Sequence, residues 1–152
     1  MKKNLIVLLL SFVTVNLFAS NPTGGKVDPV IESKFKQEFG PEVKASWENV
    51  EGVYVATFVD SKGQEKQAYY YEDGTILGRG KSINKDLLPE AAAKAINEKF
   101  NPIVVQTVYE FRSIDSPTRY FVRLVNNHFF MIISVNEFGD VYVAKKERVN
   151  RN

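Results

Sequence analysis

The sequence of 152 residues contains no cysteine and a single histidine, and it has no hydrophobic run long enough to cross a membrane. The absence of cysteine excludes disulfide scaffolds, thiolate metal sites, cysteine nucleophiles and lipid attachment at a cysteine. The lone His128 excludes metal clusters of several imidazoles and leaves at most one imidazole for acid–base chemistry. With 44% hydrophobic and 25% charged residues, the composition is that of an ordinary globular protein.

The first residues have the pattern of a secretory signal peptide. Two lysines precede an apolar run at Leu5–Leu10, and the small Ala19 stands before a polar segment. A membrane anchor is the alternative, but the run is well short of the ~18–20 apolar residues that a bilayer requires. We therefore expect residues 1–19 to be cleaved and residues 20–26 to form a flexible leader. The expected location is the periplasm, without stable membrane insertion.

Cleavage would also remove the apparent basicity of the chain. It takes away two lysines and no acid, so the count of basic residues falls from 20 to 18 and equals the 18 acidic residues. A balanced charge gives no reason to expect nucleic acid as a partner. The turn acids, such as Asp60, could offer oxygen ligands to calcium, but acids at hairpin turns usually serve backbone geometry. We expect no cofactor and no metal.

The remaining chain divides into two similar halves, each predicted to be one helix followed by four antiparallel strands. The first helix begins at Asp28-Pro29 and ends at Gly40-Pro41, and the second begins at Pro89 and ends at Phe100. Alternating apolar residues separated by turn residues indicate the strands. The predicted strands are 43–48, 53–59, 67–71, 75–77, 103–111, 120–125, 129–135 and 141–144.

Several residues recur between the halves at nearly constant offsets, which suggests an internal duplication. The recurring pairs are Phe39 and Phe100, Pro41 and Pro102, Tyr54 and Tyr120, and Gly74 and Gly139. We predict a single domain over residues 27–152, with one repeat at 27–83 and a second at 84–147. The fold class is α+β, and the two repeats continue into one sheet with both helices on one face.

These residues resemble a known family. The pattern consists of Phe39-Gly40-Pro41, Trp47, Tyr54 to Phe58, Ala68-Tyr69, Asp73-Gly74, Leu88-Pro89 and Gly139-Asp140. It is similar to the PepSY-like family of secreted bacterial proteins, whose fold is like that of β-lactamase inhibitor proteins. The resemblance implies a periplasmic, non-enzymatic protein with a binding or inhibitory role, and it transfers no catalytic residue.

Aromatic residues give the strongest indication of a binding surface. Tyr69, Tyr70 and Tyr71 are consecutive, so a strand must point one or two of them away from the helices. Exposed aromatic sheet faces are typical docking surfaces. The alternative is that both apolar faces of these strands are covered within the fold. The predicted binding residues are Trp47, Tyr54, Tyr69, Tyr71, Tyr120 and Tyr142.

The resulting hypothesis is a periplasmic binding module that acts as an inhibitor or scaffold, and whose partner is a periplasmic or extracellular protein or peptide. A small-ligand carrier or an enzyme with a site assembled from dispersed polar residues is the competing hypothesis, and self-association through the aromatic face is a third. Two Ser-x-x-Lys matches, at Ser33 and Ser82, lack the other motifs of penicillin-recognising enzymes. A deep cavity would favour the competing hypothesis, and a broad aromatic surface would favour the first.

Overall fold

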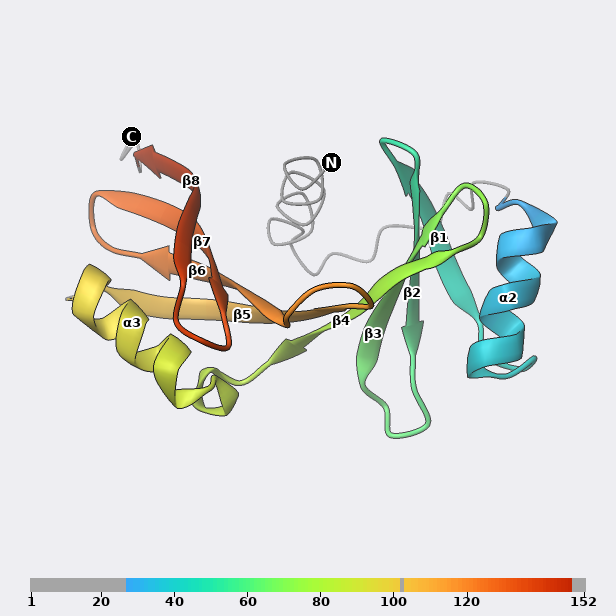
Figure 1. Cartoon of the computed structure of the whole chain (residues 1–152), viewed down its shortest axis with the longest axis horizontal. Coiled ribbons are helices and arrows are strands. Elements are labelled where there is room, and N and C mark those ends of the chain that lie inside the picture. The colour runs from blue at the N-terminus through green and yellow to red at the C-terminus, as the bar shows by residue number, and fades with distance from the viewer. Residues whose placement is uncertain (1–26, 102, 149–152) are drawn as a thin grey trace. The chain divides into compact units, whose positions relative to one another are not determined.

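The computed structural model describes residues 27–101 and 103–148 (Figure 1). The predicted signal peptide and leader lie outside the described residues. Eight strands form one antiparallel sheet in sequence order, which confirms the predicted α+β class. The elements are α2 (Pro29–Phe39), β1 (Ala45–Val50), β2 (Val53–Val59), β3 (Glu65–Tyr71), β4 (Ile76–Ile83), a 3₁₀ turn η1 (Lys85–Leu87), α3 (Glu90–Phe100), β5 (Val104–Ser113), β6 (Arg119–Val125), β7 (Phe129–Asn136) and β8 (Val141–Arg148).

The chain forms two compact units. We call residues 27–81 with 113–115 the N-terminal unit, and residues 82–112 with 116–148 the C-terminal unit. Each unit contains one α-helix of 11 residues. Within the part of the chain that the structure describes, no helix is long and apolar enough to span a membrane.

The ends of α2 follow the predicted signals. The Asp28 carboxylate accepts a hydrogen bond from the Val30 N–H at 2.8 Å, which caps the first turn, and Pro29 occupies the first helical position. At the other end Gly40 has a φ of 107°, a conformation that favours glycine, and its N–H donates to the Lys36 carbonyl.

In the N-terminal unit, one face of the strands packs against α2. Ile31 and Phe35 of the helix are buried against alternate residues of β2 and β3. Because strand side chains alternate, the neighbours of these residues point to the other side, which we call the N-terminal open face. The helix-side cluster consists of Ile31, Phe35, Ala56, Phe58, Ala68 and Tyr70, with Trp47 and Tyr54 partly buried at its margin.

The C-terminal unit repeats this arrangement with mainly aliphatic residues. Ala92 and Ile96 of α3 pack against alternate residues of β5, β6 and β7. The opposite sides of β6, β7 and β8 form what we call the C-terminal open face. The helix-side cluster consists of Ala92, Ile96, Val108, Tyr120, Val122, Leu124, Met131, Ile133 and Val135.

Two strands extend further than the sequence pattern predicts. β4 continues to Ile83 and β8 continues to Arg148, well beyond the predicted ends at residues 77 and 144. Their added residues are mainly glycines and charged residues, which lack an apolar alternation. They are held by pairing with a neighbouring strand, as in Ala68 with Arg79 and Phe129 with Arg148.

Candidate binding surfaces

The six aromatic residues predicted to bind a partner do not share one face within either unit. In the N-terminal unit Trp47 and Tyr54 lie on the side of α2, whereas Tyr69 and Tyr71 lie on the open face. Tyr69 is fully buried and donates a hydrogen bond to the Gln67 side chain at 2.8 Å, and Tyr71 is 40% exposed. Three of the four residues in this unit are therefore at least partly buried in the fold.

In the C-terminal unit the predicted pair is split in the same way. Tyr120 belongs to the cluster beneath α3 and is 6% exposed. Tyr142 pairs with Ser134 on the open face and is 56% exposed. The prediction that six aromatics form one surface is therefore wrong in its membership, because Trp47, Tyr54 and Tyr120 pack on the helix side. Tyr71 and Tyr142 are the two exposed members.

The C-terminal open face combines aromatic and basic side chains. Phe121, Ile132 and Ser134 are buried in its floor, while longer side chains around them keep contact with solvent. The strand residues of this face, identified by alternation and register, are Arg119, Phe121, Arg123, Val125, Phe130, Ile132, Ser134, Asn136, Tyr142, Lys145 and Glu147.

Phe130 organises the cations of this face. The Arg123 guanidinium carbon lies 4.8 Å from the centre of the Phe130 ring, and the Lys145 ammonium lies 5.7 Å from it. Cations are attracted to the electron-rich face of an aromatic ring at such distances. Arg119 donates a hydrogen bond to the Ser134 hydroxyl at 3.3 Å. The face therefore presents positive charge over an apolar floor.

A bulge in β8 decides which lysine reaches this face. Val143 pairs with Ile133 and Lys145 pairs with Ile132, so Ala144 is an extra residue that interrupts the alternation. Without it, Lys146 would lie on the same side as Tyr142. With it, Lys145 takes that side, and Lys146 lies over the Phe129 ring at 4.5 Å on the side of α3.

Sequence reasoning missed Arg119 and Arg123 as members of a surface. One available signal was the alternation of β6, in which Arg119, Phe121 and Arg123 fall on one side. The bulge in β8 had no comparable signal, because an extra residue in a short strand leaves no mark in the apolar pattern.

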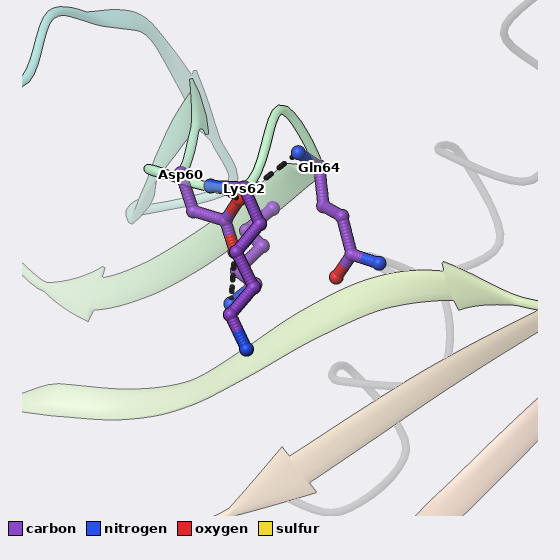
Figure 2. A network of polar contacts seen from close by, with 4 residues as sticks. Asp60, Lys62 and Gln64 are labelled. Atoms are coloured by element: carbon purple, nitrogen blue, oxygen red, sulfur yellow. Dashed lines mark hydrogen bonds and ion pairs between the residues drawn. The ribbon is translucent and has the colours of Figure 1, made fainter.

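The acid at the β2–β3 turn has a structural task, as Figure 2 shows. The Asp60 carboxylate accepts hydrogen bonds from the N–H groups of Lys62 at 2.8 Å and Gln64 at 2.9 Å, and it pairs with the Lys66 ammonium at 2.6 Å. The bond from Lys66, followed by those from the turn backbone, lowers the pKa of Asp60 from 3.8 to about 2. This carboxylate therefore stabilises the turn through bonds within the hairpin.

The other turn residues behave similarly. Asp73 accepts a hydrogen bond from the Thr75 N–H, which lowers the pKa of Asp73. His128 is exposed at the β6–β7 turn, where its N–H donates to Asn126. Among residues 27–101 and 103–148, no group of three or more histidine, aspartate or glutamate side chains is placed to hold a metal ion.

Neither Ser-x-x-Lys match forms a nucleophile–base pair on the pattern of penicillin-recognising enzymes. Lys36 forms an ion pair with Glu32 at 2.7 Å on α2. Ser82 lies in β4 and Lys85 lies in η1, so these two residues do not share the helical face that the motif requires.

Two open clefts are lined by residues that the structure describes. One of about 600 Å³ lies at the ends of β1 and β2, and Lys44, Ser46 and Glu65 are among its lining residues. The Ser46 hydroxyl donates to the Thr57 carbonyl at 3.4 Å, so it is used within the sheet. A smaller cleft of about 290 Å³ lies between η1 and β5.

Comparisons with known proteins identify the fold. No family model and no curated protein match the sequence. A "putative periplasmic" protein of Bacteroides eggerthii is similar with a TM-score of 0.70 and 18% identity, over 82% of this chain and 90% of that one. A BLIP-like protein of Bacteroides fragilis is similar with a TM-score of 0.65 and 21% identity, over 86% of this chain and 92% of that one.

A third solved structure, a DUF2874 family protein of Bacteroides ovatus, has a TM-score of 0.68 and 16% identity, over 82% of this chain and 89% of that one. All three likenesses extend over most of both chains. The predicted resemblance to the fold of β-lactamase inhibitor proteins is therefore confirmed, and the chain has a BLIP-like fold.

Proposed function

We propose that this chain is a periplasmic, non-enzymatic binding module that docks a partner protein on its C-terminal open face. The observation that carries the proposal is the exposure of Tyr142, at 56%, on the same face as Phe130 and its two ring-bound cations. Tyrosine and arginine are among the residue types that dominate protein interfaces. Membership of the PepSY-like family is part of the proposal and agrees with the fold.

The periplasmic location is supported by the N-terminal pattern of lysines, apolar run and small residue, and by the description of the Bacteroides eggerthii neighbour. Cell fractionation followed by N-terminal sequencing of the purified protein tests it. A first residue near Ser20 is the expected result. An uncleaved N-terminus in the membrane fraction would contradict it.

Site-specific photo-crosslinking tests the binding face. We would place p-benzoylphenylalanine at position 142 in the full chain, expressed with its own N-terminal segment in the organism that encodes it. Phe138 is a matched control, because it is an aromatic residue of the same unit, 68% exposed on the β7–β8 turn. We expect a discrete adduct from position 142 and none from position 138. Equal adducts from both positions, or none from either, would contradict the proposal.

Inhibition of an enzyme is the finer form of this proposal. Its support is the resemblance of the fold to inhibitor proteins. Once mass spectrometry identifies the crosslinked partner, its activity is measured with increasing amounts of the wild-type chain and of Tyr142→Ser. Inhibition by the wild type that the variant loses is expected of an inhibitor. If the wild-type chain leaves the activity of the partner unchanged, the chain is a scaffold or carrier of proteins and not an inhibitor. Size-exclusion chromatography at several concentrations separates either role from self-association.

A further inference from the structure

We propose that the C-terminal open face recognises an acidic segment of the partner, with Arg119, Arg123 and Lys145 as its carboxylate-binding residues. This inference rests on the proposed function and specifies the chemistry of the partner. The residues come from β6 and β8 of one unit. Arg123 and Lys145 flank the buried Ile132 of the strand between them, and Arg119 lies beside Ser134 further along that strand.

The charge of the face favours an anionic ligand. Its strand residues include three cations, and Glu147 is the single acid among those described. Glu147 already pairs with the Lys145 ammonium at 2.6 Å. The N-terminal open face has the opposite character, since Glu48 and Glu65 are the charged residues at its described strand positions. Positive charge is therefore concentrated on the face of one unit, although the predicted mature chain is balanced.

Arg123 supplies the most specific feature. Its guanidinium lies over the Phe130 ring, and its buried Nε has no hydrogen-bond partner among the described residues. A buried charged donor without an acceptor is unfavourable, so a carboxylate that reaches this nitrogen by moving the atoms that cover it would supply the missing bond. A guanidinium stacked on a ring keeps its edge available for two parallel bonds to a carboxylate.

The spacing of the cations fits an extended segment. Arg119 and Arg123 lie on the same side of β6 four residues apart, which is about 13 Å at the rise of a strand. Arg123 and Lys145 flank Ile132 across β7, which places them two strand spacings or about 10 Å apart. An extended segment with carboxylates four residues apart could contact Arg119 and Arg123 together, while apolar residues between them lie on the floor.

A protein segment suits the face better than a lipid surface or a nucleic acid. Three cations, one of them already paired, are too few for stable binding to a membrane or to a phosphate backbone. The accessible Tyr142 and Phe130 instead offer apolar contacts of the kind found at the centres of protein interfaces.

The experiment selects binders from a phage library of random dodecapeptides. The target is the protein purified after expression of the whole chain and export by its own host. We expect the enriched peptides to contain an excess of aspartate and glutamate. The best of them, synthesised with a fluorescent label, should lose about tenfold in affinity on Arg123→Gln and on Lys145→Gln. Arg123→Lys should retain part of the affinity, and added salt should weaken binding.

Lys146→Gln is the matched control, because Lys146 is the next residue of β8 and also lies over a phenylalanine ring, but on the side of α3. It should leave the affinity unchanged. Equal losses for Lys145→Gln and Lys146→Gln would mean that only net charge matters and would overturn the proposal. Thermal unfolding of each variant verifies that the fold is kept, and Arg123→Lys remains informative if Arg123→Gln does not fold.

The outcomes separate this inference from the proposed function. If the enriched peptides have no excess of acids yet lose affinity on Tyr142→Ser, the binding face stands and the acidic preference is overturned. If no enriched peptide responds to any substitution on the face, both fail. If vesicles of phosphatidylglycerol bind the wild type and not Arg123→Gln, while no acidic peptide is enriched, the ligand is a membrane and the inference is overturned.

Discussion

Beneath α2 the N-terminal unit gathers aromatic rings, whereas beneath α3 the C-terminal unit packs mainly aliphatic side chains. Phe35 lies 5.0 to 5.4 Å from the ring centres of Phe39, Trp47 and Phe58, with two of these contacts edge-to-face. Tyr120 is the one aromatic ring among the buried residues of the cluster beneath α3. Aromatic residues of the N-terminal unit thus stabilise its interior, and those of the C-terminal unit include Phe130 and Tyr142 on the open face.

This difference teaches that an aromatic residue in a strand is not by itself evidence of a binding surface. Trp47 and Tyr54 are partly buried on the side of α2, and Tyr70 is almost completely buried there. Tyr142 differs because α3 packs on the other side of the strands in its unit. Packing against a helix therefore buries some of the aromatic residues, while Tyr69 and Phe121 are buried on the open faces without it.

The largest expected effect comes from removing the ring at the centre of the aromatic cluster. Phe35→Ala should lower the free energy of unfolding by about 3–5 kcal/mol, because it leaves a cavity and removes three ring contacts. Urea unfolding followed by the fluorescence of Trp47, the only tryptophan, measures it in the N-terminal unit.

Ile96→Ala in α3 is the comparison variant, with an expected cost of about 2–5 kcal/mol, because Ile96 is equally buried but has aliphatic neighbours. A smaller loss for Phe35→Ala than for Ile96→Ala would contradict the view that aromatic packing holds the N-terminal unit together.

Two corresponding glycines should differ in their tolerance of a methyl group. Gly74 and Gly139 both have positive φ, at 76° and 89°, in the last hairpin turn of their units. A Cβ at Gly139 would come within 2.9 Å of the Ala91 carbonyl oxygen, which belongs to the helix backbone. A Cβ at Gly74 would instead meet the Lys34 side chain at 3.1 Å, and that side chain can move.

We therefore expect Gly74→Ala to cost about 1 kcal/mol from backbone strain, and Gly139→Ala to cost about 2–3 kcal/mol because the helix must also shift. Thermal or urea unfolding of both variants provides the measurement. Equal costs would mean that the α3 backbone at Ala91 moves away from the new methyl group as easily as the Lys34 side chain does.

Alkaline pH should affect two of the buried tyrosines, Tyr70 and Tyr120, unequally. Burial, with a further contribution from the Glu38 carboxylate, raises the pKa of Tyr70 far above its ordinary value of 10.0. Burial and the nearby Glu110 raise the pKa of Tyr120 as well. Above pH 10 the unfolded chain releases these protons more readily than the folded chain does, so stability is lost as the pH rises.

Replacing Tyr70 by Phe should flatten this decline, by at most about 1.4 kcal/mol per pH unit for one group. Tyr120→Phe should flatten it less. Urea unfolding at several pH values between 9 and 11, with the wild type in parallel, checks both. If Tyr70→Phe leaves the slope unchanged, then Tyr70 ionises in the folded protein as easily as in the unfolded chain.

Much of the fold follows from local signals in the sequence. The boundaries of α2 depend on Asp28, Pro29 and Gly40, and all three act within a few residues of their own position. The strand β2 is predicted at its observed bounds because Val53–Val59 is β-prone and flanked by turn residues. Internal duplication remains a prediction, although each unit has one helix and four strands.

Neither open face could be predicted from the sequence, because the residues of each face are brought together by pairing between strands. Both sides of β2 are apolar, so periodicity alone does not reveal which side packs against α2. The approach of Arg123 and Lys145 further depends on the register of β6, β7 and β8 and on the bulge at Ala144. A shift of one residue in that register would exchange Lys145 for Lys146.

The smallest expected effect concerns the corresponding hairpins β2–β3 and β6–β7, which use an acid in one unit and an amide in the other. The Asp60 carboxylate accepts hydrogen bonds from the N–H groups of Lys62 and Gln64. The Asn126 side chain accepts from those of His128 and Phe129 at 2.8 and 2.9 Å.

The Lys66 bond lowers the pKa of Asp60 from 3.8 to about 2. The stabilising contribution of the Asp60 carboxylate is therefore present above pH 4 and is lost as the pH falls toward 2. Asp60→Asn should remove this dependence on acid, whereas Asn126→Asp should introduce one in the C-terminal unit. Urea midpoints between pH 2 and 5 measure both changes, and an unaltered acid profile for Asp60→Asn would mean that the hairpin is held by its backbone geometry and not by the charge.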